Sequence, residues 1–532
     1  MSANYHLTSS QKRNVMSPQE QLNQLKQAQK YVHDILLAPV YDIAIQTSVD
    51  RLKLMSQRLG NDVYVKREDE QPVHSFKLRG AYNKLATLTP SQLESGVVAA
   101  SAGNHAQGLA LSAKSMNVVA TIVMPETTPE IKVNAVRGHG ANVVLHGKSF
   151  DEANNFALNL AEQRNLSYIH PFDDEAVIVG QGTVAKELLQ QVRDLDYVFI
   201  PVGGGGLLAG MAVYIKQLKP EIQVIGVEPE GAACLKVALE QGQPTDLEQV
   251  DIFADGVAVK RIGENTFKLA QKYCDQVITV NSDEICAAIK DLFDDVRAIA
   301  EPAGALSLAG LKKFVSENNI KNKRLSCVLS GANLNFDKLR YVSERTELGE
   351  KKEAVFAVKI PERKGAFIEF CDALAGKPIT EFNYRYHDES EANVFVGLKL
   401  SDAEVEAKQV ISKLEQADYQ IINLTDNELA KLHIRHMVGG KPNTAINEKI
   451  YSFEFPEYPG ALSKFLNTLG QNWNITLFHY RNHGAAVGQV LAAFEAKDTD
   501  VERLQCHLDE LGYVWKNETD NLSFQLFLQN KN

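Results

Sequence analysis

Lys77 is the residue of this chain best placed to do covalent chemistry. It lies between Phe76 and Leu78 in residues 74–83 (HSFKLRGAYN), after a strand-like run at 63–65. Desolvation by apolar neighbours disfavours the ammonium form of a lysine and lowers its pKa. Such an amine is a nucleophile that can hold an aldehyde cofactor as a Schiff base. Since a surface lysine can also lay its stem along apolar neighbours, this interpretation depends on three further segments.

A turn that could bind a carboxylate follows a second apolar run. Residues 101–108 (SAGNHAQG) come directly after the strand-like residues 97–100. Small polar residues followed by Gly-Asn are typical of a tight turn that leads into a helix. Ser101, Asn104 and free backbone N–H groups would then point to one spot, where a helix N-terminus favours negative charge. An ordinary helix cap would have the same sequence.

Four consecutive glycines, residues 203–206, separate the strand-like residues 197–202 from a helical run that starts near Leu207. Glycine N–H groups with no Cβ atoms around them are accessible to a phosphate. A dinucleotide-binding pattern, G-x-G-x-x-A with an acidic residue after the next strand, also fits here. The residues of that pattern are Gly204, Gly206, Ala209 and Glu228. A nicotinamide or flavin enzyme is therefore a rival interpretation, but it gives no role to Lys77.

Ser330 ends a further buried strand-like run, in residues 328–333 (VLSGAN). A small hydroxyl residue at the carboxyl end of a strand in an α/β sheet lies where ligands bind, although ordinary turns also use serine. Each of the four segments lies next to a strand-like run. Their agreement favours one cofactor site built from distant parts of the chain.

These segments resemble those of the pyridoxal-phosphate threonine/serine dehydratases, fold type II enzymes related to the tryptophan synthase β-subunit. The similarity extends to residues 65–69, 255–259 and 300–305. With the C-terminal part it matches the biosynthetic threonine dehydratases in particular, with no departure at the positions that matter. The resemblance implies a catalytic domain of two α/β subdomains over residues 37–345, after a polar tail and lead-in helix at 1–36. The alternation of strand-like and helical runs agrees with such a sheet.

The resemblance also assigns roles to single residues. Lys77 would hold pyridoxal 5'-phosphate and act as the catalytic base, and Phe76 would pack against the cofactor ring. Asn104 would hydrogen-bond to the 3-hydroxyl of the cofactor, and Ser330 would contact its pyridine nitrogen. The phosphate would be bound by Gly203, Gly204, Gly205, Gly206 and Leu207. The substrate carboxylate would be bound by Ser101, Gly103, Asn104 and His105.

The implied reaction is α,β-elimination of L-threonine, and also of L-serine, which converts threonine to 2-oxobutyrate and ammonia in the first step of isoleucine biosynthesis. A serine-preferring dehydratase, or another fold type II enzyme of β-elimination or replacement, is the alternative. The two substrates differ by one methyl group, which is worth only about 1–3 kcal/mol. A neutral hydroxyl at Ser330 would leave the pyridine nitrogen unprotonated. The weaker electron sink should favour elimination over racemisation or transamination.

The C-terminal part contains a duplicated block. Residues 361–367 (PERKGAF) reappear as 456–462 (PEYPGAL), and residues 379–387 reappear as 475–483, at offsets of 95 and 96 residues. A constant period indicates a duplicated domain. Each copy reads strand, helix, strand, strand, helix, strand, which is the ferredoxin-like order; the first helix is expected over 366–374.

The two copies resemble ACT-like regulatory domains, over residues 353–427 and 449–523 with a linker at 437–447. In that family the pair binds isoleucine as a feedback inhibitor, which valine opposes, and the enzyme is a homotetramer. Residues that recur at matched places are the predicted effector contacts: Tyr384, Arg385, Tyr480 and Arg481. A repeated fold also repeats its packing residues. A non-catalytic amino-acid sensor would explain the repeat but would leave Lys77 without a role.

The bulk composition fits a multidomain globular enzyme. The chain has 532 residues, 44% of them hydrophobic and 23% charged, with a formal net charge of −11. Its basic residues are scattered, which argues against nucleic-acid binding. No apolar run is long enough to cross a bilayer. The six cysteines show no C-x-x-C spacing and no convincing metal-ligand set, as expected of a cytoplasmic protein with reduced thiols. The polar first residues read as a disordered tail, with a short organellar presequence as the alternative.

Overall fold

A computed structural model gives the structure of this chain, which divides into two compact units, Met1–Leu334 and Asn335–Asn532. Each unit is described by itself. The structure describes residues 18–336, 338–349, 352–361, 369–370, 373–374, 377, 379–384, 391–401, 403–436, 447–456, 464–465, 468–469, 473–481 and 487–529. The first residues of the predicted tail, most of the predicted linker and most of the helix expected over 366–374 lie outside these ranges.

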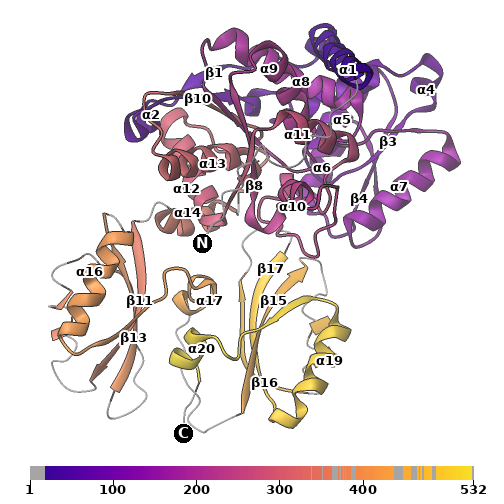
Figure 1. The fold of residues 1–532 in the computed structure, drawn as a ribbon. Coiled ribbons are helices and arrows are strands. Elements are labelled where there is room, and N and C mark those ends of the chain that lie inside the picture. The colour runs from indigo at the N-terminus through magenta and orange to yellow at the C-terminus, as the bar shows by residue number, and fades with distance from the viewer. Residues whose placement is uncertain are drawn as a thin grey trace. The chain divides into compact units, whose positions relative to one another are not determined.

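The first unit is built on two sheets, each made largely of parallel strands (Figure 1). The larger sheet has the strand order β1-β2-β10-β7-β8-β9, and every neighbouring pair is parallel except β1 with β2. Its strands are β1 (Val49–Arg51), β2 (Asp62–Arg67), β7 (Tyr197–Pro201), β8 (Gln223–Pro229), β9 (Gln276–Val280) and β10 (Arg324–Leu329). Parallel strands are buried on both faces, and β7 and β10 are accordingly buried at every position after the first, without alternation.

The smaller sheet has the order β5-β4-β3-β6, with all pairs parallel. Its strands are β3 (Val97–Ala100), β4 (Ala120–Met124), β5 (Asn142–Leu145) and β6 (Ser167–Tyr168). Successive side chains of a strand point to opposite faces. Val97 and Ala99 therefore enter the core on one face, while Val98 and Ala100 pack on the other face against Ala153. The prediction of two α/β subdomains is confirmed.

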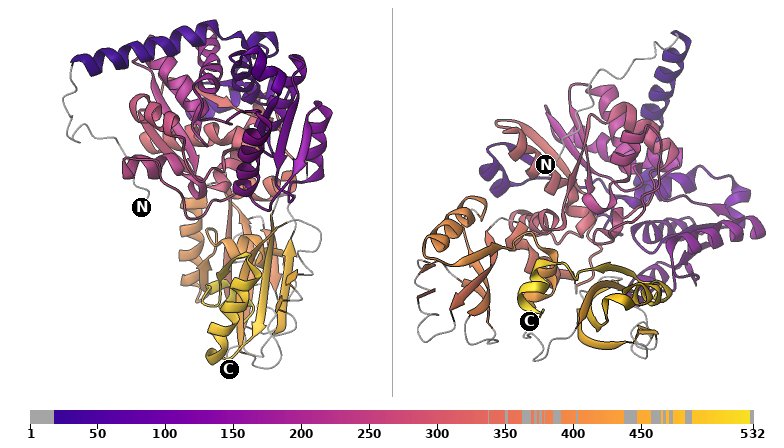
Figure 2. Two further views of the ribbon diagram at one scale, coloured as in Figure 1. Left: turned by 90° about the vertical axis from the view of Figure 1, so that its right-hand side faces the viewer. Right: turned by 60° about the horizontal axis from the view of Figure 1, so that its bottom comes forward.

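Helices cover the faces of both sheets. Those of the first unit are α1 (Pro18–Leu37), α2 (Lys53–Leu59), α3 (Lys77–Ala86), α4 (Pro90–Ser95), α5 (Asn104–Ser115), α6 (Glu130–Gly138), α7 (Phe150–Arg164), α8 (Glu175–Gln191), α9 (Gly206–Leu218), α10 (Cys234–Gln241), α11 (Glu264–Tyr273), α12 (Ser282–Val296) and α13 (Pro302–Asn318). The long helix α1, drawn in indigo, packs against α8 and α9 (Figure 2). Tyr31 and Ile35 of α1 are buried in the same core cluster as Ile178 of α8 and Met211 of α9.

The second unit contains the predicted duplication. It begins with α14 (Lys338–Gly349), and its two four-stranded sheets have the orders β12-β13-β11-β14 and β16-β17-β15-β18. The strands are β11 (Glu353–Pro361), β12 (Ile379–Tyr384), β13 (Glu391–Lys399), β14 (Gln420–Asn423), β15 (Glu448–Pro456), β16 (Asn474–Arg481), β17 (Val487–Glu495) and β18 (Val514–Asn517). Each order reads 2-3-1-4 within its copy, as in a ferredoxin-like sheet. Even an irregularity in register repeats, between Ile379 and Glu381 and again between Ile475 and Leu477.

The two copies share a core cluster of their own. The second helix of each copy, α16 (Ala403–Gln416) or α19 (Val501–Leu511), is followed after a short strand by α17 (Glu428–Leu432) or α20 (Leu522–Phe527). Val355 and Ile450, from the first strands of the two copies, lie in one buried cluster with Leu429 of α17 and Phe524 of α20. The duplicated domains are thus packed together as one body.

Candidate active site

The predicted site segments meet at one cavity in the first unit. The cavity is lined by Phe76, Lys77, Asn104, Phe172, Pro201, Gly203, Gly204, Gly205, Gly206, Leu207, Gly256, Val257, Val259, Glu301, Ala303 and Ser330. The carboxyl ends of β7 and β10 lead into it, at residues 201 and 330, as expected for ligand sites of α/β sheets. All the predicted cofactor residues are therefore brought together.

Four helices begin at this cavity. α3 starts at Lys77, α5 at Asn104, α9 at Gly206 and α13 at Pro302, directly after Glu301. The first N–H groups of a helix have no partners within it, and the helix dipole makes this end positive. Four such ends favour a ligand with more than one negative group, such as a phosphate and a carboxylate.

Lys77 is the first residue of α3, and it lines the cavity. Its Nζ donates a hydrogen bond to the carbonyl oxygen of Pro171 at 3.1 Å and lies 5.3 Å from the centre of the Phe76 ring. Burial lowers the pKa of the amine to about 8, and the negative charge of Glu301 opposes this shift. A larger fraction of this amine is unprotonated near neutral pH than of an ordinary lysine, as nucleophilic chemistry requires.

The two residues before Lys77 pair through their backbone with the segment that contains Ser330. Ser75 forms an antiparallel bridge with Gly331, and the Phe76 N–H donates to the Ser330 carbonyl at 3.2 Å. The Ser330 hydroxyl is buried and donates to the carbonyl of Ala303 at 3.3 Å. The segment before α3 and the segment after β10 are thus fixed together on one side of the cavity.

The glycine loop forms a cradle with no room for side chains. A Cβ built on Gly204 would lie 2.2 Å from the Phe172 ring, and one on Gly203 would lie 2.9 Å from the Val257 backbone. Gly205 has φ +89°, a conformation that side chains disfavour. The loop runs into the N-terminus of α9. The bare N–H groups of the loop fit the phosphate of pyridoxal phosphate, so Gly203 to Leu207 would hold that group. The buried amine fits its aldehyde, so Lys77 would hold the aldehyde.

Asn104 is held by two partners that sequence reasoning missed. Its Nδ2 donates to Glu301 Oε1 at 2.6 Å, and its Oδ1 accepts from Asn333 Nδ2 at 2.7 Å. The second hydrogen on Nδ2 stays available for a cofactor hydroxyl. Glu301 lies in the 300–305 block and Phe172 precedes α8, and neither carries a local pattern that marks it as a site residue.

The turn predicted to bind the substrate carboxylate precedes α5. Gly103 is the N-cap residue; its N–H donates to Ser101 Oγ at 3.3 Å, and the space where a Cβ would stand is open. His105 is oriented differently from a ligand-binding side chain. Its buried Nε2 lies 3.1 Å from the Ile169 carbonyl, and burial lowers its pKa to about 3. Of the four predicted carboxylate residues, Asn104 alone lines the cavity; His105 could contribute its backbone N–H.

Glu228, the acidic residue of the dinucleotide alternative, has a different role. Its carboxylate accepts hydrogen bonds from the N–H groups of Leu235 and Lys236 at 2.7 and 2.9 Å, at the start of α10. The side chain is fully buried, and burial raises its pKa to about 7. Both carboxylate oxygens of Glu228 are therefore engaged at the start of α10. The dinucleotide interpretation loses the acidic residue that would bind the ribose of the cofactor.

The predicted effector residues occupy matched strand positions in the two copies. Tyr384 pairs with Val394 at the end of β12, and Tyr480 pairs with Val490 in β16, with Arg481 next to it. Arg385 lies outside the described residues. Within the described part of the chain, no group of three or more histidine, cysteine or acidic side chains could hold a metal ion. No helix among the described residues is long and apolar enough to cross a membrane.

Comparisons with known proteins agree with this geometry. Residues 40–331 match the family model described as pyridoxal-phosphate dependent enzyme. Residues 344–434 and 440–528 each match the C-terminal regulatory domain of threonine dehydratase. The biosynthetic L-threonine dehydratases of Salmonella typhimurium and Escherichia coli are each 55% identical over 513 residues, which is 96% of this chain and 100% of theirs.

More distant relatives and solved structures cover the same parts. The mitochondrial threonine dehydratase of Saccharomyces cerevisiae is 48% identical over 94% of this chain and 89% of its own length. The processed form of threonine deaminase isoform 2 from Solanum lycopersicum is 50% identical, with a TM-score of 0.60 over 60% of this chain and 93% of that chain. Serine racemase from Dictyostelium discoideum is 35% identical, with a TM-score of 0.54 over 57% of this chain and 99% of its own. With its lysine and glycine cradle in one cavity and its duplicated C-terminal unit, the chain belongs to the biosynthetic threonine dehydratases, pyridoxal-phosphate-dependent enzymes with a C-terminal regulatory domain.

Proposed function

We propose that this chain is an L-threonine ammonia-lyase that converts threonine to 2-oxobutyrate and ammonia, and that it also accepts L-serine. The observation that carries the proposal is the position of the Lys77 amine in the same cavity as the glycine cradle, Asn104 and Ser330. When bound, pyridoxal phosphate supplies an electron sink for the charge that develops at the substrate Cα. The remaining tasks belong to side chains of the protein.

Lys77 is the proton acceptor at the substrate Cα. Its pKa of about 8 makes it a base matched to neutral or slightly alkaline conditions. The amides of the glycine cradle hold the cofactor phosphate, and the turn around Ser101 and Gly103 holds the substrate carboxylate at the start of α5. Carboxylate and phosphate anchors at the N-termini of α5 and α9 would fix the Cα–H bond near Lys77, which lowers the entropic part of the barrier.

Asn104 and Ser330 orient the cofactor ring without adding charge. Glu301 and Asn333 fix the amide of Asn104, so that its free N–H points in one direction. Ser330 would offer a neutral hydroxyl to the pyridine nitrogen, which would leave the cofactor a weaker electron sink. A weaker sink would favour elimination over racemisation or transamination.

The second unit would bind isoleucine, which inhibits the enzyme, and valine, which opposes isoleucine. The matched pairs Tyr384 with Arg385 and Tyr480 with Arg481 are the proposed contacts. A coupling free energy of about 1–3 kcal/mol between effector and substrate sites changes threonine affinity roughly 5–150-fold. The family resemblance supports a homotetramer in the cytoplasm.

The test is 2-oxobutyrate formation from threonine by the purified protein, with and without isoleucine. We expect product formation that isoleucine suppresses and valine restores. The variants Tyr384→Phe and Tyr480→Phe should weaken suppression while leaving activity without isoleucine unchanged. Activity that isoleucine leaves unaltered would contradict the effector proposal, and a higher kcat/KM for serine would favour a serine dehydratase. Protein that carries bound cofactor but forms no 2-oxo acid from either substrate would contradict the lyase proposal.

A further inference from the structure

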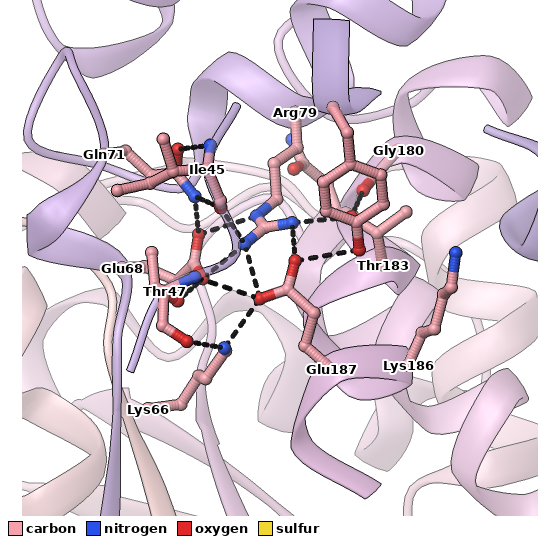
Figure 3. A network of polar contacts seen from close by, with 12 residues as sticks. Ile45, Thr47, Lys66, Glu68, Gln71, Arg79, Gly180, Thr183, Lys186 and Glu187 are labelled. Atoms are coloured by element: carbon pink, nitrogen blue, oxygen red, sulfur yellow. Dashed lines mark hydrogen bonds and ion pairs between the residues drawn. The ribbon is translucent and has the colours of Figure 1, made fainter. Parts of the chain in front are cut away.

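Four charged side chains form a closed network in the interior of the first unit (Figure 3). Lys66, Glu68, Arg79 and Glu187 have side-chain exposures of 0–1%. Arg79 contacts both carboxylates in bidentate fashion, at 2.7 and 2.8 Å to Glu68 and at 2.6 and 3.0 Å to Glu187. The Lys66 ammonium donates to Glu187 at 2.6 Å. Two positive and two negative charges balance, as burial of charge requires.

Neutral groups complete the network. Arg79 also donates to Thr183 Oγ1 at 3.1 Å and to the Ile45 carbonyl at 3.3 Å. Lys66 donates in addition to the Thr47 carbonyl at 2.8 Å and to Gln191 at 2.9 Å, so each of its three protons has an acceptor. A buried ionic network is weak evidence for stability, because well-packed apolar residues often replace one at no cost. The presence of this buried network is therefore not explained by its contribution to stability, which leaves a role for its geometry.

The geometry of the network fixes the start of α3. Arg79 lies in the first turn of this helix, two residues after Lys77, while its partners come from α8 and from the end of β2 and the turn that follows it. Where α3 crosses α8, the helices meet at glycines: a Cβ on Gly180 would lie 2.5 Å from the Arg79 carbonyl, and one on Gly80 would lie 2.3 Å from Gln181. The Gly80 N–H donates to Gln181 Oε1 at 3.2 Å and Asn83 Nδ2 donates to the Ala176 carbonyl at 2.7 Å, so hydrogen bonds, together with the ion pairs of Arg79, fix the register of the two helices.

We propose that Arg79 is a positioning residue for the Lys77 amine, because its two bidentate ion pairs fix the rotation of the first turn of α3 against α8 and β2. The planar guanidinium suits this role, since it presents donors in a rigid fork while an ammonium is a point charge. Lys77 is held in its buried place by this anchor and by its own bond to Pro171. This inference rests on the proposed role of Lys77 in the lyase reaction.

The consequence is a link between the network and the chemistry of the amine. A first turn that is free to rotate exposes the Lys77 amine to solvent, and its pKa then rises from about 8 toward the ordinary value of 10.5. The neighbouring groups that act on this amine electrostatically are Glu301, His105 and His170. They belong to elements other than α3 and stay in place in an Arg79 variant.

The test uses Arg79→Lys, which keeps the charge but loses the fork. Lys84→Met is a matched control, because Lys84 pairs with Asp174 at 2.6 Å and links the same two helices, with side chains about one-fifth exposed. In the cofactor-free full-length proteins, the rate of Lys77 acylation by a small amine reagent is followed against pH by peptide mass mapping. This readout does not depend on which amino acid is the substrate, so it can succeed or fail separately from the lyase proposal.

We expect the apparent pKa of Lys77 to rise by about one unit in Arg79→Lys, which means about tenfold less free amine at pH 7. The kcat of the holoenzyme should fall by a similar factor with KM nearly unchanged, and Lys84→Met should match the wild type in both. If Arg79→Lys does not fold, Thr183→Val removes a single acceptor of Arg79 and should shift the pKa in the same direction. An unchanged Lys77 pKa in a folded variant, or an equal shift in Lys84→Met, would overturn the proposal.

Discussion

The amide nitrogen of Asn104 lies 2.6 Å from a carboxylate oxygen of Glu301, although 197 residues separate the two in the sequence. This contact puts a carboxylate into the cavity that contains the Lys77 amine. Its charge opposes the effect of burial on that amine. The protein thus combines a buried lysine with a counter-charge that keeps its pKa from falling further.

The change Glu301→Gln tests this balance. The amide keeps the hydrogen bond to Asn104 but removes the negative charge that raises the Lys77 pKa. We expect the apparent pKa of Lys77 in the cofactor-free protein to fall below about 8. The measurement is the pH dependence of acylation of Lys77. Glu264→Gln, at an exposed side chain of α11, serves as the control; an unchanged or higher pKa in Glu301→Gln would exclude a role for its charge.

Stability of the cofactor-free protein should depend on Lys77 in a defined pH window. The folded pKa of about 8 lies below the unfolded value of about 10.5, so the folded state binds fewer protons between these values. The protonated amine therefore destabilises the fold at pH 7, and stability rises with pH from about 8 to 10.5. Allowing for partial solvent access to this side chain, we expect Lys77→Met to be more stable by about 2 kcal/mol at pH 7.

Urea denaturation of cofactor-free wild type and Lys77→Met at several pH values checks this. The difference should be largest at pH 7 and should disappear above pH 10.5. A Lys77→Met protein that is less stable than the wild type at pH 7 would show that the amine is not destabilised by burial.

Cofactor affinity should depend on the bare glycine cradle. In Gly204→Ala the new methyl group would meet the Phe172 ring, and the ring or the loop must move. We expect cofactor affinity to fall at least about tenfold, as measured by titration of the cofactor-free protein with pyridoxal phosphate and detection of its visible absorbance. Gly138→Ala, at a helical glycine with open space around it, should bind as the wild type does. Equal affinities of the two variants would argue against a phosphate site at the loop.

The neutral hydroxyl of Ser330 should determine the outcome of the reaction. A carboxylate in Ser330→Asp would keep the pyridine nitrogen protonated and strengthen the electron sink. The longer-lived carbanion should then give more racemised or transaminated product per molecule of 2-oxobutyrate. Product ratios from isotopically labelled threonine measure this partition. A ratio that stays at the wild-type value, in a variant that still binds cofactor, would refute the role given to Ser330.

Local pattern was enough to predict the parts of the site that are continuous in sequence. The glycines and Ser330 come directly after strands, so strand ends bring them to one cavity, and the bridge of Ser75 with Gly331 brings Lys77 to the same place. Glu301 and Asn333 act through contacts to Asn104 over 197 and 229 residues, and nothing in their own segments indicates such a contact. Short patterns also mislead: Glu228 has the spacing of a dinucleotide site, but its carboxylate caps α10.

Borohydride reduction of the holoenzyme tests whether Lys77 holds pyridoxal phosphate. Reduction fixes the cofactor on its lysine, and trypsin no longer cleaves there. Because the flanking cleavage sites are Arg67 and Arg79, we expect one modified peptide of residues 68–79 that carries the phosphopyridoxyl mass. A phosphopyridoxyl group on a different lysine, with Lys77 cleaved normally, would show that Lys77 is not the cofactor lysine.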